Sequence, residues 1–406
     1  MKLRRLDDLT RDELARLGRE FMLHGHLFDR ALMPQVAMHF GGGEIEPLSI
    51  WEWQGASPNY TRRMRRLMRI EGDDVAAIVK ALQLDVGFPH EYMDVRFQLA
   101  DDGSAEFWLN HCGALMDVEP RGEKGVVMMC HRIEDPTFDA TAVATNPRAR
   151  MRPIHRPPRI PADRHPHCHW TIRIEPGADP LVEQPLTRRV GALPIANVPN
   201  EPPRDRDADG WPDYAGPFDP DFRLERLGRG ALVAALREFS LQAHLLASAA
   251  DLFLSERHDR AQVRETLADQ WQGASWVAAQ RIAAELGIGG GVAGVAEAIA
   301  LHPALPPGVD ATLEPVGERG LRVALDAPPM LLDPAAPGWI GLLAAGETRA
   351  LAAIAQAVEP RARVEAIGER AFRVDVDPSR APAEPPQSVT LTRLSTAASW
   401  KFRRFA

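Results

Sequence analysis

The five-residue string WQGAS occurs twice in this chain, at Trp53–Ser57 and at Trp271–Ser275. The two occurrences lie 218 positions apart, and the same offset separates Arg19-Glu20-Phe21 from Arg237-Glu238-Phe239. A short match alone has little weight, but a repeated offset indicates that a longer unit has been copied. We therefore interpret the chain as an internal duplication, in which WQGAS marks a structural corner of the repeated unit.

The match continues downstream with a small slip in the offset. Residues Gly72–Leu82 lie over Gly289–Ile299, and Met93–Leu109 lies over Val309–Leu325 without a gap. The sequence therefore predicts two tandem copies of one domain. The predicted plan is a first copy, a linker rich in Pro and Asp, a degenerate second copy and a C-terminal tail, at 1–180, 181–224, 225–380 and 381–406.

Each unit begins with a helical pattern. Thr10-Arg11-Asp12-Glu13 is a capping box that opens a long helix to about Phe40. We expect a second helix after the first WQGAS and a third after Gly72-Asp73-Asp74. Helices therefore occupy the first part of the unit.

Strands follow the helices. Alternating residues flank Asp101-Asp102-Gly103-Ser104, which is typical of a hairpin turn. GVVMMCHRI (125–133) and HCHWTIRIE (167–175) are interpreted as two more strands. The predicted fold class is α+β, with a helical bundle and an antiparallel sheet in each of two tandem copies.

Composition limits the function classes. The 406 residues are 45% hydrophobic and 26% charged, with a net charge of −8, which is typical of a globular protein without a phosphate-binding surface. No apolar run of about 18 residues and no apolar signal core occur, so we expect no nucleic-acid or membrane partner. Three cysteines, a sparse and odd number, favour a reducing cytoplasm. A homodimer is possible.

The two copies differ in their cysteines and histidines. All three cysteines lie in copy one beside histidines, whereas copy two has Ala327-Pro328-Pro329 where copy one has His111-Cys112-Gly113. The fold therefore does not need these residues. Thiolate and imidazole are ligands that suit zinc and iron. The predicted metal ligands are Cys112, Cys130, Cys168, His111, His131, His165, His167 and His169.

Two other interpretations of the cysteines remain open. A cysteine beside an imidazolium can be a nucleophile, because the positive charge favours the thiolate. Free cysteines are also commonly small core residues. Adjacent residues of a regular strand point to opposite faces, so a Cys–His pair such as Cys168-His169 cannot share one pocket.

The segments HCGALMDVEP (111–120), MMCHRIEDPTF (128–138) and HCHWTIRIE (167–175) resemble the bacterial L-2-amino-thiazoline-4-carboxylic acid hydrolase-like family. The resemblance covers residues 10–175, and Cys112, Cys130 and Cys168 match the family's cysteine positions. It implies a small-molecule site and hydrolytic chemistry in copy one, with copy two as a degenerate echo.

Acid–base candidates lie near the first cysteine. Asp117 and Glu119 are two residues apart, so they share a face if the segment is extended. His155 lies in a basic loop stiffened by prolines, where neighbouring arginines suit a substrate carboxylate. Solvated loop positions are the alternative for all three. The predicted catalytic residues are Cys112, Glu119, Asp117 and His155.

The linker contains a weak calcium pattern. Asp205, Asp207, Asp209 and Asp213 have the spacing of the first ligands of a calcium loop. The position of the bidentate glutamate of an EF-hand is occupied by Gly216. A solvated acidic linker is the alternative.

Together these features predict an enzyme in which copy one hydrolyses a C–N bond of a small polar molecule, with a heterocycle as one option. Zinc or iron would assist the hydrolysis. Copy two is then a supporting pseudo-domain. The alternative is a non-catalytic protein that uses a metal or haem to sense a small molecule or the redox state.

Overall fold

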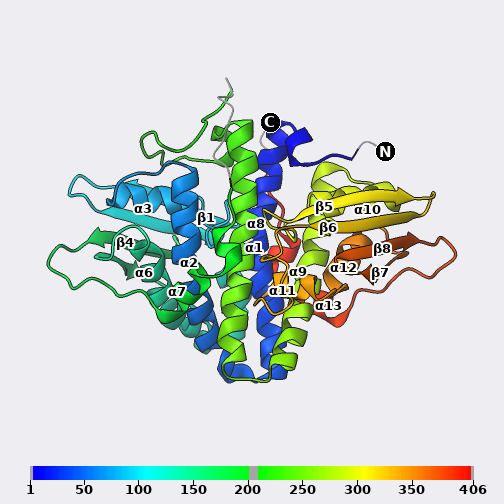
Figure 1. Ribbon diagram of the computed structural model, residues 1–406. Coiled ribbons are helices and arrows are strands. Elements are labelled where there is room, and N and C mark those ends of the chain that lie inside the picture. The colour runs from blue at the N-terminus through cyan, green and yellow to red at the C-terminus, as the bar shows by residue number, and fades with distance from the viewer. Residues whose placement is uncertain (1–2, 201–208, 404–406) are drawn as a thin grey trace.

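The computed structural model describes residues 3–200 and 209–403. Two antiparallel sheets flank a central group of long helices (Figure 1). The α+β class with two tandem units is thereby confirmed. The long helices are α1 (Arg11–His39), α2 (Ile45–Leu67), α8 (Arg229–Ser255) and α9 (Arg260–Leu286).

The same order of elements follows the long helices in both halves. The first half continues with α3 (Val75–Leu82), β1 (Met93–Leu99), β2 (Ala105–Cys112), α6 (Glu134–Val143), β3 (Ala149–His155), β4 (Cys168–Ile174) and α7 (Pro185–Gly191). The second continues with α10 (Gly291–Ala300), β5 (Asp310–Val316), β6 (Gly320–Asp326), α12 (Arg349–Val358), β7 (Ala362–Gly368), β8 (Ala371–Val376) and α13 (Gln387–Thr392). The sheet orders, β1-β2-β4-β3 and β5-β6-β8-β7, correspond strand by strand.

Shorter helices connect these elements. In the first half they are α4 (Gly113–Val118), α5 (Glu123–Val127) and a π-helical turn at Met128–Ile133; in the second they are α11 (Trp339–Ala344) and α14 (Thr396–Ser399). The capping box of α1 is present, because the Thr10 side chain accepts a hydrogen bond from the Glu13 N–H while the Glu13 carboxylate accepts one from the Thr10 N–H.

The long helices pack mainly across the two halves. α1 packs on α9, and α2 packs on α8. Arg63 of α2 forms a buried pair with Glu238 of α8, with Nη2 2.6 Å from Oε1. The counterpart residues form the counterpart pair, in which Arg281 Nε donates to Glu20 Oε2 at 2.6 Å. Reciprocal contacts of this kind are those of a two-fold interface, so the chain resembles a dimer fused into one polypeptide.

The starts of the two halves exchange a second reciprocal pair of contacts. Arg11 Nε donates to the Leu227 carbonyl at 3.0 Å, and Arg229 Nε donates to the Leu9 carbonyl at 3.0 Å. The largest hydrophobic core runs through both halves. The pseudo-two-fold relation therefore includes the segments that precede α1 and α8.

The role predicted for WQGAS needs correction. Both copies lie inside helices, because α2 begins at Ile45 and α9 at Arg260, well before each string. A Cβ atom on Gly55 would lie 2.9 Å from Leu186 of α7, and one on Gly273 would lie 2.8 Å from the Ser388 carbonyl of α13. The string is repeated because its small residues allow a short helix to pack directly on the long one.

A second correction concerns GVVMMCHRI, which forms α5 and the π-helical turn instead of a strand. Only Val126, Val127 and Ile133 in it are β-branched, and the other residues are compatible with a helix. The sheet takes β3 in its place, and β3 ends at His155, which was expected in a loop.

The stretches predicted as linker and tail contain ordered elements. The first contains α7, and the second contains α13 and α14. No single helix of the described chain is long and apolar enough to cross a membrane; α9 and α10 pass that test as a pair, but they are bent by 107°.

Candidate functional site

The three cysteines enter the core of the first half from three elements. Cys112 ends β2, Cys130 lies in the π-helical turn and Cys168 begins β4. All three are buried, and none forms a disulfide. Cys112 also caps α4, because its Sγ atom accepts a hydrogen bond from the Leu115 N–H at 3.3 Å.

Burial raises the pKa of each of these thiols, that of Cys112 to about 12. The charge of Glu134 acts in the same direction, and Cys112 and Cys168 both raise the pKa of Cys130. The three thiols therefore share one electrostatic neighbourhood. Nucleophilic attack needs a thiolate, which this environment disfavours.

Two histidines of the predicted metal set, His131 and His169, and the predicted catalytic residue His155 are bonded to groups other than the thiols. His131 Nε2 donates to the Pro157 carbonyl at 2.7 Å, and His155 Nε2 donates to the Pro166 carbonyl at 3.0 Å. His169 pairs with Glu106 at 2.9 Å, whereas its neighbour Cys168 is buried in the core. The alternation expected of a strand therefore separates this Cys–His pair.

His111, His165 and His167 lie together. Their ring centroids are 5.6 Å apart for His111 and His167, and 5.2 Å apart for His165 and His167. His167 Nδ1 accepts a hydrogen bond from the Cys112 N–H at 3.1 Å, so the proton of the neutral ring lies on Nε2. Burial lowers the pKa of His167 to about 4, which keeps the ring neutral.

Within residues 3–200 and 209–403, no group of three or more His, Cys, Asp or Glu side chains is placed to hold a metal ion. The zinc or iron site stays a prediction. Of the predicted calcium ligands, Asp205 and Asp207 lie outside the described residues, and Asp213 pairs with Arg69 at 3.3 Å.

The predicted catalytic carboxylates have structural partners. Asp117 accepts the Thr396 N–H at 2.7 Å and pairs with Arg30 at 3.2 Å. Glu119 binds Arg159 with both oxygens, at 2.8 and 2.6 Å. His155 is bonded to a backbone carbonyl, so each of Asp117, Glu119 and His155 has a partner within the protein.

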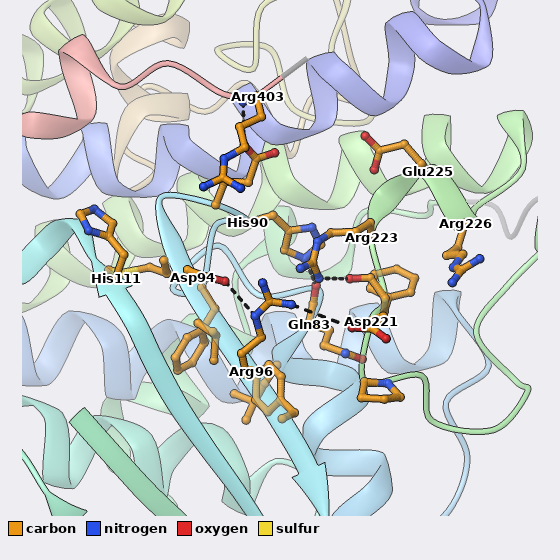
Figure 2. Close-up of a pocket in the computed structure, with 18 of the residues that line it drawn as sticks. Gln83, His90, Asp94, Arg96, His111, Asp221, Arg223, Glu225, Arg226 and Arg403 are labelled. Atoms are coloured by element: carbon orange, nitrogen blue, oxygen red, sulfur yellow. Dashed lines mark hydrogen bonds and ion pairs between the residues drawn. The ribbon is translucent and has the colours of Figure 1, made fainter. Parts of the chain in front are cut away.

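A cavity of about 720 Å³ opens beside the edge strand β1 of the first half (Figure 2). The end of α3 and the loop after it, β1, residues 220–226 and the tail at 400–403 form its walls. Its volume is within the range of small-molecule sites, about 300–1,000 Å³. Of the predicted site residues, only His111 lines it.

His111 is held at the wall of this cavity by Trp400. The two rings are stacked, with centroids 5.0 Å apart and planes at 19°. Burial lowers the pKa of His111, whereas the charge of Asp94, its partner in the β1–β2 register, raises it. The Nε2 atom has no hydrogen-bond partner in the part of the chain that the structure describes. That atom is buried; a neutral imidazole acts as a base where water can reach its free nitrogen.

The second half has an equivalent but smaller cavity of about 430 Å³ at the start of β5. Arg5 occupies the place that corresponds to Arg223 in the first half, and its Nη2 donates to the Ala311 carbonyl at 2.9 Å. Arg237, which also lines this cavity, pairs with Asp7 at 3.1 Å. These contacts match those of the counterparts Arg223 and Arg19, but the first cavity is also lined by Lys401 and Arg403 from the tail.

A buried polar cluster also distinguishes the first half. Burial raises the pKa of Glu52 well above its usual value, and the neighbouring Asp29 raises it further. The Glu52 carboxyl group is fully buried, and Asp29 is the acid whose charge acts on it. At the positions corresponding to Asp29, Arg30 and Glu52, the second half has Ala247, Ser248 and Gln270.

Sequence reasoning missed most of the cavity. His90, Arg96, Arg223 and Arg403 come from segments far apart in the chain, and none belongs to a motif. The one available signal was the basic character of the C-terminal tail. Comparison with models of known families, with curated proteins and with solved structures finds no match to this chain.

Proposed function

We propose that the first half is the working half of a hydrolase-like enzyme that acts on a C–N bond of a small polar molecule in the cavity beside β1. One observation carries the proposal: this cavity is lined by His111 together with cations that have no carboxylate partner among the described residues. In the second half, Ala327 stands at the position of His111, and the cations that line the corresponding cavity are Arg5 and Arg237. The resemblance to the thiazoline-carboxylic acid hydrolase-like family supports the reaction class.

In the proposed reaction, His111 takes a proton from water as the water oxygen attacks the carbon of the C–N bond. The resulting imidazolium then gives that proton to the departing nitrogen as the bond breaks. Asp94 favours the imidazolium, and Trp400 fixes the ring plane. Arg223 and Arg403 face the negative charge that develops on the substrate. No step uses a metal or a thiolate.

The second half has a supporting role in this proposal. Arg281 of α9 donates through Nη1 to the Trp400 carbonyl at 2.6 Å, so it holds the residue that stacks on His111. Its counterpart Arg63 binds the Ala196 carbonyl at 3.0 Å. In each half, an arginine of the second long helix thus holds the segment that follows that half's sheet.

The test is His111→Gln, compared with His165→Gln at an exposed histidine outside the cavity. The substrates are small acids with hydrolysable C–N bonds, including L-2-amino-thiazoline-4-carboxylic acid. We expect His111→Gln to lower kcat by about 100-fold or more, the usual effect of losing a general base, and His165→Gln to have little effect.

The pH profile gives a second readout. The base must be neutral, and the pKa of His111 lies below its usual value, so wild-type kcat/KM should stay high down to pH values below about 6.5. Equal activity of His111→Gln and wild type would exclude His111 as the base.

A non-catalytic sensor is the second candidate, because three cysteines converge in one buried neighbourhood. Metal analysis and a visible spectrum of protein purified without a histidine tag separate the two. A stoichiometric metal or a haem band, together with no turnover of any substrate, favours the sensor.

A further inference from the structure

Three cations that line the cavity have no carboxylate partner within the described ranges: Arg223, Lys401 and Arg403. Arg223 Nη1 donates to the carbonyl of its neighbour Phe222 at 2.7 Å. Arg403 is held through its backbone, because its N–H donates to Glu91 at 2.7 Å. In a chain with a net charge of −8, unpaired cations gathered in one hollow indicate an anionic ligand.

The acids of the cavity are engaged elsewhere. Glu91 and Glu225 both pair with Arg19, at 3.3 and 2.7 Å. Asp94 pairs with Arg96 at 3.0 Å, and Asp221 lies 3.9 Å from the same guanidinium group. The three cations therefore remain available to a ligand.

The tail segment that carries the two cations is held by contacts of its backbone and of neighbouring side chains. The Thr396 N–H donates to Asp117, and the Trp400 carbonyl accepts from Arg281. The ring of Phe402 contacts Arg19 and Arg281, whose guanidinium carbons are 5.7 and 5.6 Å from the ring centroid. Because the segment is ordered before a ligand arrives, binding does not carry the cost of ordering it.

The cations come from two walls of the cavity. Arg223 belongs to the segment before α8 and lies beside His90 in Figure 2, whereas Arg403 reaches in from the tail. A ligand with one acidic group would bind the cation of one wall and leave the cation of the other wall without a partner. We propose that the ligand is a small organic acid with two or more carboxylates, and that the tail following the second half completes the binding site of the first.

This inference rests on the proposed location of the site and adds the class of ligand. It also gives a reason for the fused arrangement, because the first half alone contains neither Lys401 nor Arg403. The guanidinium group suits this role, since it binds a carboxylate through two parallel hydrogen bonds.

Calorimetric titration of the full chain with citrate, succinate, acetate and inorganic phosphate tests the proposal. We expect citrate to bind most tightly, with an affinity that falls as salt is added. Arg223→Gln and Arg403→Gln should each weaken citrate binding by about 10- to 100-fold, the usual effect of one charge-assisted contact. Arg403→Lys should retain part of the affinity. The matched control is Arg5→Gln, the counterpart of Arg223, which should bind citrate like wild type.

Acetate or phosphate binding as tightly as citrate would overturn the proposed ligand class. Unchanged citrate binding in both Arg223→Gln and Arg403→Gln, or equal weakening in Arg5→Gln, would place the site elsewhere. The proposed function fails separately, if citrate binds as expected but His111→Gln hydrolyses substrates as well as wild type.

Discussion

Cys112 ends β2 with its Sγ atom accepting a hydrogen bond from the Leu115 N–H, so it caps a helix and fills the core at once. In the nucleophile interpretation, the histidines beside the three cysteines lower the thiol pKa values. In the structure the thiol pKa values are raised instead, because burial disfavours the thiolate and the charge of Glu134 disfavours it further. The pKa of Glu134 is itself raised to about 8 by burial, so at neutral pH it is mostly a neutral acid.

The thiols should therefore react slowly in the folded protein. With a disulfide reagent at pH 7.5, we expect much less than one thiol per chain to react while the protein is folded. All three should react after denaturation, since the sequence contains three cysteines. One rapidly reacting thiol, mapped to Cys112, Cys130 or Cys168 by mass spectrometry, would restore the nucleophile interpretation.

At the scale of elements, sequence patterns predicted a helix start or a turn correctly where residues close in the chain form that structure by themselves. The Thr10–Glu13 capping box and the turn at Asp101–Ser104 are short-range features, and both occur as expected. The role of WQGAS was predicted wrongly because the string packs against α7 or α13, which lies more than 100 residues away along the chain.

The tight contact at the second WQGAS predicts a measurable asymmetry. An alanine Cβ at Gly273 meets the Ser388 carbonyl at 2.8 Å, and backbone cannot rotate away, so Gly273→Ala should destabilise the protein by about 1–3 kcal/mol. Gly55→Ala meets the side chain of Leu186 and should cost less. Gly43→Ala, in open space, is the control. Denaturant unfolding measures all three, and equal stability of Gly273→Ala and Gly43→Ala would contradict this packing account.

At the scale of the whole molecule, the duplication was readable from sequence and the site was not. A constant offset is a property of the chain, but the cavity unites the region 82–111 with residues 220–226 and 400–403. These segments meet because the long helices pack across the two halves. Local sequence patterns do not predict that packing. Only His111 was singled out from sequence, through its neighbour Cys112.

The central claim is that two equivalent halves have diverged so that the first alone binds an acidic small molecule. A crystal structure of the chain soaked with citrate tests it most directly, because both cavities are seen in one experiment. The account predicts citrate density beside β1, between Arg223 and Arg403, and none at the equivalent cavity around Arg5 and Arg237. Citrate in the second cavity alone, or in both with equal occupancy, would contradict the account.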